Sequence, residues 1–364
     1  MNILQRIFSD HYEEIIYTLH PRKTEIENID KMIHCGDPSF GGTMFACPSC
    51  GNKYSMQRST SMSFKLINVF HRHCVFTVDS QLRVFFLHDR SLLDGLFHAV
   101  NSVVSRMFFN LNKSMNFTPG FIMVLHTFGR DLKWNPYIHC LISEGGYSDH
   151  GFCRNVHHFN YTFLRNSFRT ALLNELESRI DPSFKKQKAR CYKEHKDSFY
   201  VYQKPNKCDP STVLKYIGRY LGRPVIATSR IDSYDGDFVT FHYNRHEDNK
   251  YVEETIPVME FIQRLIRHIP EKHYKMIRYG GIYARHREID KQLHRAISRE
   301  KRHIYRTFHQ WRTAILSSFG YDPLKCGCGT TMLFLELYFN HKRVSLEEMY
   351  EKAMSRSRGK RSSA

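Results

Sequence analysis

Two apolar stretches joined by a short loop predict a β-hairpin, and this feature restricts the possible folds of the chain more than any other. The second stretch, WNPYIHCLISEGG, occupies residues 134–146 and reads as a strand that follows Pro136 and ends at a Gly-Gly turn. The first, GFIMVLHT, occupies residues 120–127. A loop of about nine residues favours antiparallel pairing of the two strands. The chain is therefore expected to contain an antiparallel sheet.

Each predicted strand carries one histidine, His126 in the first and His139 in the second. Two histidines placed two residues apart on a strand would share a face, because side chains alternate, and would offer a divalent metal two imidazoles. The residue two positions before His139 is Tyr137, so this strand holds one imidazole and one phenol. Two interpretations stay open for the histidines: metal ligands, or buried side chains that hydrogen-bond within the core.

Apolar periodicity predicts further helices and strands around this hairpin. The pattern indicates an α+β protein in which an antiparallel sheet is flanked by helices. Helices are expected near residues 1–30, 91–112, 159–179, 210–221, 260–268 and 284–319, and strands near residues 70–78, 198–203, 239–243 and 251–258.

A length of 364 residues favours several domains rather than a single core. We predict an N-terminal helix with a Cys-rich module at 1–65, a central domain with the sheet at 66–260, and a helical region at 261–345. Residues 346–364 form a basic tail of low complexity, which is expected to be disordered.

The charge of the chain points to a polyanionic partner. Lys and Arg number 54 against 36 Asp and Glu, which gives a formal net charge of +18. Such a field attracts nucleic acid, and an acidic lipid surface is the weaker alternative. No apolar stretch is long enough to cross a membrane, and no P-loop or signal-peptide block is present, so we expect a cytoplasmic protein without a nucleotide cofactor.

Two tyrosines on a short basic helix are candidate nucleophiles. In KYIGRYLGRP, Tyr216 and Tyr220 are four residues apart and therefore share one helix face. Lys215, Arg219 and Arg223 surround them and can bind phosphate. A phenol that attacks a phosphodiester forms a covalent phosphotyrosine link. The alternative is that both rings simply pack, with their hydroxyls at the surface.

Clustered cysteines at both ends of the chain are candidate zinc ligands. Cys47 and Cys50 form a C-x2-C pair, half of a tetrahedral zinc site, and Cys35 can supply a third thiolate. Reduced thiols in a Gly-rich loop are the alternative. Near the C-terminus, Cys326 and Cys328 are separated by one residue instead of two, which strains chelation by that pair.

Taken together, these segments resemble the HUH-type two-tyrosine rolling-circle transposases of the IS91-like insertion sequences. The resemblance extends over most of the chain. It rests on the Cys-rich start and on HRHCVFTVDSQLR, LHTFGRDLKWNPYIHCLISEGG, KYIGRYLGRP followed by TSRI, and CGCGTTMLFLEL. It implies a bacterial protein that cuts and rejoins single-stranded DNA at insertion-sequence ends and at a DNA target, in association with the nucleoid.

The resemblance also implies roles for individual residues. The second histidine of the HUH strand corresponds to His139 and the first to Tyr137, a departure from the family pattern. His126 on the neighbouring strand is the expected third ligand of a Mg²⁺ or Mn²⁺ ion. Tyr216 and Tyr220 correspond to the nucleophiles that form 5′-phosphotyrosine intermediates. The N-terminal zinc-binding segment, with Cys35, Cys47 and Cys50, is shorter than the family pattern.

Two other functions stay open at this point. Because Tyr137 replaces a metal histidine, the chain is also consistent with a catalytically impaired DNA-binding remnant of such a transposase. A rolling-circle replication nuclease would use the same residue types. The presence of Tyr137 in place of a metal-binding histidine therefore lowers the metal-dependent DNA cleavage that we expect from this chain.

Overall fold

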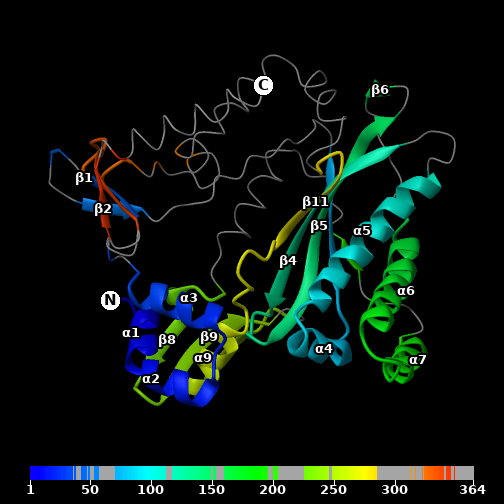
Figure 1. Ribbon diagram of the computed structural model, residues 1–364, viewed down its shortest axis with the longest axis horizontal. Coiled ribbons are helices and arrows are strands. Elements are labelled where there is room, and N and C mark those ends of the chain that lie inside the picture. The colour runs from blue at the N-terminus through cyan, green and yellow to red at the C-terminus, as the bar shows by residue number, and fades with distance from the viewer. Residues whose placement is uncertain are drawn as a thin grey trace. The chain divides into compact units, whose positions relative to one another are not determined.

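The computed structural model shows a chain of mixed helices and antiparallel sheets, which confirms the predicted α+β class (Figure 1). Two compact units are present: Met1–Ser63 together with His303–Ala364, and Phe64–Arg302. The division into four predicted segments, with boundaries after residues 65, 260 and 345, stays a prediction. The structure describes residues 1–35, 37, 42–46, 48–49, 53–56, 70–111, 117–148, 151–152, 160–195, 199, 201–203, 225–245, 248–284, 312, 316, 322, 324–339, 342–345 and 348.

A six-stranded antiparallel sheet forms the centre of the Phe64–Arg302 unit. Its strands follow the order β11-β4-β5-β3-β7, and β6 pairs with the end of β5. The predicted hairpin is confirmed as its two longest strands, because β4 and β5 pair along most of their length. The strands are β3 (His71–Thr77), β4 (Thr118–Phe128), β5 (Trp134–Ser148), β6 (Gly151–Phe152), β7 (Val201–Gln203) and β11 (Ile277–Gly281).

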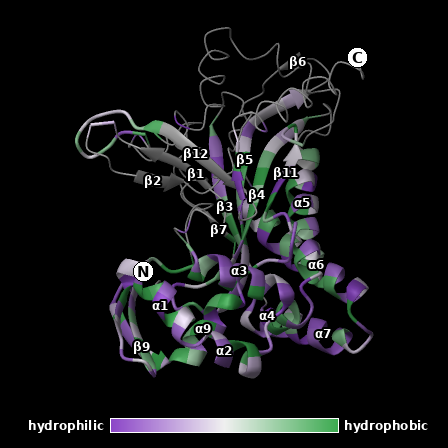
Figure 2. Cartoon of the chain, turned by 60° about the vertical axis from the view of Figure 1, so that its left-hand side comes forward, coloured by the Kyte–Doolittle hydropathy of each residue, from purple (hydrophilic) through white to green (hydrophobic). Residues whose placement is uncertain are grey.

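Helices cover one face of this sheet, as Figure 1 shows for α5 and α6. The main core lies between them: Phe76 of β3 packs edge-on against Phe168 of α6, with ring centroids 5.0 Å apart. In Figure 2 the apolar colour gathers where these helices meet the strands. The helices on this side are η3 (Ser80–Leu82), α4 (Arg83–His88), α5 (Leu92–Leu111), α6 (Tyr161–Arg179) and α7 (Phe184–Glu194).

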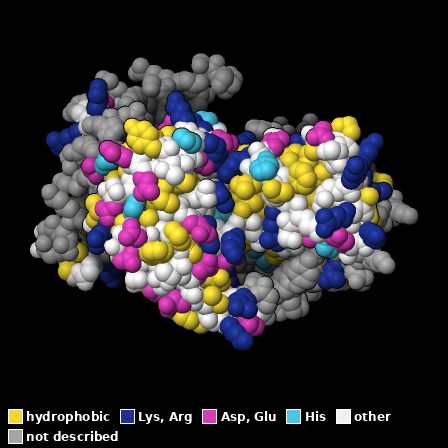
Figure 3. Space-filling model, turned by 90° about the horizontal axis from the view of Figure 1, so that it is seen from below, with side chains coloured by type: hydrophobic (Ala, Val, Ile, Leu, Met, Phe, Trp, Pro, Cys, Tyr) yellow, Lys and Arg dark blue, Asp and Glu magenta, His cyan; other side chains and the backbone are white. Residues whose placement is uncertain are grey.

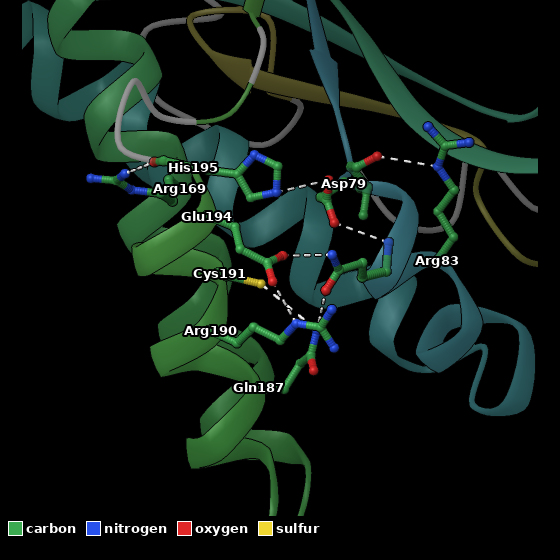
Figure 4. A network of polar contacts seen from close by, with 10 residues as sticks. Asp79, Arg83, Arg169, Gln187, Arg190, Cys191, Glu194 and His195 are labelled. Atoms are coloured by element: carbon green, nitrogen blue, oxygen red, sulfur yellow. Dashed lines mark hydrogen bonds and ion pairs between the residues drawn. The ribbon is translucent and has the colours of Figure 1, made fainter.

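A polar network fastens the start of this helical layer to its last helix (Figure 4). Asp79, two residues after β3, accepts a hydrogen bond from the backbone N–H of Gln81. Its carboxylate also lies 3.0 Å from His195 Nε2 and forms an ion pair with this imidazole when the imidazole is protonated. Gln81 in turn donates to Glu194, and Arg169 donates to the backbone carbonyl of His195. Sequence patterns predicted α6 but not α7. Helix α7 is mostly polar and buries only two side chains, so it lacks a clear apolar periodicity.

A second, smaller sheet lies later in the same unit. Its strands follow the order β10-β9-β8, and α9 packs against it through Phe241 and Phe261, whose ring centroids are 5.7 Å apart. The two strands predicted near 239–243 and 251–258 are confirmed as β9 and β10, and β8 is an addition. The elements are η4 (Thr228–Arg230), β8 (Ile231–Tyr234), β9 (Phe238–Asn244), β10 (Tyr251–Pro257) and α9 (Val258–Ile266).

The other unit combines segments from the two ends of the chain. Its helical part begins at an Asn2 capping box and buries Ile7, Ile15 and Ile29. Its sheet follows the order β13-β12-β1-β2, so strands from within the predicted helical C-terminal region pair with N-terminal ones. The elements are α1 (Ile3–Asp10), α2 (Tyr12–Glu14), η1 (Ile15–Leu19), α3 (Lys23–Ile33), β1 (Gly42–Ala46), β2 (Lys53–Met56), β12 (Leu333–Phe339) and β13 (Lys342–Val344).

Helices predicted near residues 210–221 and 284–319 lie outside, or almost wholly outside, the described residues. Among the described helices, none has the length and apolarity that a membrane crossing requires. On the face shown in Figure 3, Lys and Arg side chains are spread among acidic and apolar ones. The positive net charge is therefore not gathered into one patch on that face.

Candidate catalytic histidine cluster

Alternation along the strands separates two kinds of side chain. On β5, Ile138, Cys140 and Ile142 belong to the core beneath the helices, so Tyr137 and His139 point to the opposite face. The strand register extends this face to the neighbouring strands. His126 of β4 pairs with Tyr137, and Val75 of β3, two residues after His73, pairs with His139.

Three imidazoles and one phenol meet on this face, and we call His73, His126, His139 and Tyr137 the histidine cluster. His73 Nε2 and His139 Nδ1 form a hydrogen bond of 2.8 Å, and their rings stack with centroids 5.0 Å apart. The ring of His126 meets that of His139 edge-on, with centroids 4.7 Å apart. The hydroxyl of Tyr137 lies 3.4 Å from His126 Nδ1. The predicted proximity of His126 and His139 is therefore present.

Burial keeps the centre of this cluster neutral. His73, His126 and His139 are 5%, 7% and 7% exposed. The pKa of His139 falls to about 2, mainly because burial disfavours the charged imidazolium and also because His126 and His73 are close. A neutral imidazole is the form that binds a metal ion. His139 is thus available as a ligand throughout the physiological pH range.

The donor chemistry of the cluster fits a transition metal better than Mg²⁺. Imidazole nitrogen suits Mn²⁺ and softer divalent ions, whereas Mg²⁺ prefers oxygen ligands. The nearest candidate carboxylate on β5, Glu144, lies on the helical face and accepts a 2.6 Å hydrogen bond from Arg72. Among the described residues, no group of three or more His, Cys, Asp or Glu side chains is arranged to hold a metal. His126 and His139 therefore fit as a partial site.

The structure adds a ligand candidate that sequence patterns did not single out. His73 belongs to the sequence His-Arg-His at 71–73, in which two histidines are two residues apart, the spacing that β5 lacks. This spacing is the feature of the sequence that could have identified His73 as a candidate ligand. The two imidazoles have different neighbours. His71 Nε2 bonds to the hydroxyl of Tyr283 at 2.7 Å, and His73 joins the cluster.

Of the other predicted site residues in the first half of the chain and the tyrosine segment, the structure places only Cys35. Tyr216, Tyr220 and the cations Lys215, Arg219 and Arg223 lie outside the described residues, as do Cys47 and Cys50. Cys35 is described and exposed, and its backbone carbonyl accepts a 2.7 Å hydrogen bond from the side chain of Gln5.

Comparison with known proteins defines the class. Residues 120–290 match a family described as "Putative transposase", and residues 7–59 match a "Transposase zinc-binding domain". The first match contains the β4–β5 hairpin and the segment with the tyrosine pair. These two matches define a transposase with an N-terminal module of a zinc-binding type.

Two individual transposases of insertion-sequence type or putative transposase type are similar to this chain. The transposase for insertion sequence element IS801 of Pseudomonas savastanoi pv. phaseolicola is 28% identical over 297 residues, 72% of this chain and 71% of that protein. The putative transposase y4qJ of Sinorhizobium fredii is 27% identical over 262 residues, 66% of each chain. No solved structure matches. Together, the two family matches and the two relatives support an IS91-like family of transposases, proteins that act on DNA.

Proposed function

We propose that this protein transposes DNA by nicking and rejoining a single strand through a covalent 5′-phosphotyrosine intermediate. The observation that carries the proposal is the contact between His126 and His139, which lie on adjacent strands of the face opposite the helical core. Two imidazoles that can each bind a metal ion through a ring nitrogen therefore lie side by side, as the resemblance to HUH transposases leads us to expect. The DNA substrate is single-stranded at the ends of the insertion sequence and at the target.

In this proposal His126 and His139 hold a divalent ion, Mn²⁺ or Mg²⁺, beside Tyr137. When bound, the metal polarises the scissile phosphate as a Lewis acid. The hydrogen bond between His73 Nε2 and His139 Nδ1 orients the ring of His139, as partners of metal-binding histidines commonly do. Burial keeps the imidazole of His139 neutral, and the water-poor surroundings strengthen the attraction of both rings for a cation.

Tyr216 or Tyr220 supplies the nucleophile. Its phenolic oxygen forms a bond to the phosphorus, its proton leaves to solvent or a nearby base, and the bond from phosphorus to the 3′ oxygen breaks. The 3′ oxygen takes up a proton, so the products are a 5′-phosphotyrosine and a free 3′-OH. In a further strand transfer, a 3′-OH attacks the phosphorus of a phosphotyrosine, the new phosphodiester forms, and the tyrosine phenol leaves; the second tyrosine can supply a second such intermediate. Lys215, Arg219 and Arg223 bind the phosphate groups on either side.

The test uses a labelled single-stranded oligonucleotide that carries the element end, incubated with Mn²⁺ or Mg²⁺ and resolved on a denaturing gel. We expect a protein–DNA band that resists denaturation and disappears in Tyr216→Phe/Tyr220→Phe. Tyr251→Phe, at an exposed position of β10, is the matched control and keeps the band. A band that survives the double change would exclude these nucleophiles.

Tyr137 favours one alternative, a DNA-binding remnant that no longer cuts. Its hydroxyl, beside His126 Nδ1, occupies a position where the family pattern has a metal ligand, and a neutral phenol is a poor ligand for Mg²⁺. Such a remnant binds single-stranded DNA with a steep salt dependence but gives no covalent band with any metal. Cleavage that does not depend on the terminal sequence would instead favour a replication nuclease.

A further inference from the structure

A cavity of about 200 Å³ lies in the Phe64–Arg302 unit, between the start of α5, the end of β4 and the chain that follows α9. Thr127 lines it from β4; this residue follows His126 in the sequence and therefore points to the opposite face of the strand. The ring of Phe128 stacks on His126, with centroids 5.6 Å apart, and meets edge-on the ring of His268, which also lines the cavity, with centroids 5.5 Å apart. The cavity is thus at the same end of β4 as the histidine cluster.

The size and the apolar walls of this cavity suit one small planar group. Pockets that bind drug-sized molecules measure about 300–1,000 Å³, so this cavity takes a smaller group, of the order of one nucleobase. Leu93 of α5, together with Pro270 and Met276, supplies apolar walls. Proteins that bind a base outside the helical stack hold it between apolar or aromatic side chains and recognise it by hydrogen bonds at its edge. The polar side chains at the cavity then decide which base fits.

Arg90 is a cation held in a fixed position at the cavity. Its guanidinium donates to the carbonyls of Arg267 and Ile269, at 2.6 and 3.2 Å, and lies 5.1 Å from the ring centroid of Trp134. The ring of Trp134 in turn stacks on His268, with centroids 5.8 Å apart. A side chain that is already ordered loses little freedom when a ligand binds, which favours recognition by Arg90.

Tyr274 brings a buried hydroxyl to the same cavity, and two acidic residues bring carboxylates. The Tyr274 hydroxyl has no hydrogen-bond partner of good geometry among the described residues, although Asp94 and Arg278 lie near it. A buried hydroxyl without a partner costs free energy, so one that lines a cavity points to a ligand that pairs with it. Asp94, which forms an ion pair with Arg278, and Glu271 supply carboxylates, and these groups only accept hydrogen bonds. The cavity therefore offers both donors and acceptors.

We propose that this cavity binds one unpaired guanine of single-stranded DNA. Guanine presents two acceptors, O6 and N7, together with donors at N1 and at its 2-amino group, so it requires donors and acceptors in one site. Arg90 and the Tyr274 hydroxyl donate to the acceptors of the base, and the Glu271 carboxylate accepts from its donors.

The other bases and the phosphate groups of DNA suit the cavity less well. Thymine has no amino group to donate to a carboxylate, and adenine has no O6. Cytosine has the amino group but lacks N7 and the second ring. Two carboxylates, those of Asp94 and Glu271, disfavour a phosphate group at the same place. The inference rests on the proposed single-stranded DNA substrate but not on the nicking reaction.

The first experiment measures base preference through Trp134, whose ring contacts two side chains of the cavity, Arg90 and His268. Trp311→Phe removes the other of the two tryptophans, so that the emission reports this site alone. The full-length chain is titrated, without divalent metal, with short oligo-dT strands that carry one central dG, dA or dC, and with oligo-dT alone. We expect the dG strand to bind about tenfold more tightly than the other strands and to change the emission of Trp134.

Two negative outcomes of this titration have different meanings. Equal affinity for all four strands would overturn the guanine site and leave the single-stranded DNA substrate in place. Failure of every strand to bind would overturn both. Because no metal is present, neither outcome depends on whether the protein nicks DNA.

The second experiment tests the acceptor side of the cavity with Glu271→Gln. This change should lower the affinity for the dG strand about tenfold and leave the binding of oligo-dT unchanged, because an amide does not offer two acceptor oxygens. Glu253→Gln, the same change of charge at an exposed position of β10, is the matched control and should keep the preference for dG. An equal change for both strands in Glu271→Gln would indicate a general effect of charge and overturn the assignment.

The third experiment tests the donor side with Tyr274→Phe. Removal of the hydroxyl should weaken binding of the dG strand several-fold without lowering the thermal unfolding midpoint, because this hydroxyl has no partner of good geometry among the described residues. A lower unfolding midpoint together with an unchanged preference for dG would give the hydroxyl a structural role alone and contradict the proposal.

Discussion

The two faces of the central sheet are both buried, yet they are built from different chemistry. Beneath α5 and α6, the strands contribute apolar side chains such as Phe76 and Ile138, which are completely buried. On the opposite face, the same strands bury His73 and His139. Apolar burial stabilises a fold, whereas burial of titratable rings must be offset by hydrogen bonds. We therefore expect the helical face to supply most of the stability of this unit, whereas the proposed metal site lies on the histidine face.

The largest expected effect comes from the helical face. Phe76→Ala should lower the free energy of unfolding by about 3–5 kcal/mol, because it leaves a cavity against Phe168. His139→Ala on the other face should destabilise by less than half of that amount but abolish metal-dependent nicking. Denaturant titration and the oligonucleotide assay measure the two quantities. An equal decrease in the free energy of unfolding in both variants would contradict the expectation that the helical face contributes more to stability than the histidine face.

Acid should destabilise the protein through a buried histidine at the hairpin end. The pKa of His268 falls to about 4, chiefly because of burial, although its hydrogen bond to the carbonyl of Leu132 opposes this. The unfolded state binds a proton near pH 6.5 and the folded state does not, so stability falls as the pH drops from about 6.5 toward 4.

The loss attributable to His268 should reach up to about 3 kcal/mol near pH 4, and His268→Gln should remove it. Unfolding midpoints of both proteins at pH 7 and pH 5 measure the difference. His98→Gln, at an exposed position of α5, is the control and should leave the slope unchanged. An unchanged slope in His268→Gln would show that this imidazole does not stay neutral in the folded chain.

A smaller gain is expected on the histidine face. Tyr137→His should raise the rate of metal-dependent nicking by about tenfold, which corresponds to about 1.4 kcal/mol of transition-state stabilisation. The physical reason is that an imidazole replaces a neutral phenol beside His126 and His139. Single-turnover nicking in Mn²⁺ measures the rate, with Tyr279→His on β11 as control. If the wild type already nicks rapidly and the change has no effect, Tyr137 does not impair the site.

The smallest effect is expected in the polar network that joins β3 to α7. His195→Gln removes the ion pair with Asp79, whose partners are partly exposed, and should change the free energy of unfolding by less than about 1 kcal/mol. Arg169 keeps its bond, because it binds the backbone carbonyl of residue 195. Thermal unfolding measures the change. A loss as large as that of Phe76→Ala would show that this network, rather than apolar packing, holds the helical layer.

Local patterns predicted the parts of the fold whose partners are close in sequence. The β4–β5 hairpin, the long helix α6 and the β9–β10 pair follow from apolar periodicity and short loops. Helix α7 was missed because its sequence, FKKQKARCYKE, is mostly charged and buries only Phe184 and Cys191. Strands β12 and β13 were missed because their pairing with β1 depends on a segment at the other end of the chain.

The sequence by itself determined that His126 and His139 lie side by side, because a short loop pairs their strands and side chains alternate along each strand. It also contained the tyrosine pair and the cysteine motifs, which need no tertiary contact to be recognised. Only the tertiary structure decided that His73 joins the histidines and that β12 lies beside β1. Both depend on strands that are distant in sequence, and periodicity within a strand carries no information about which other strand it will pair with.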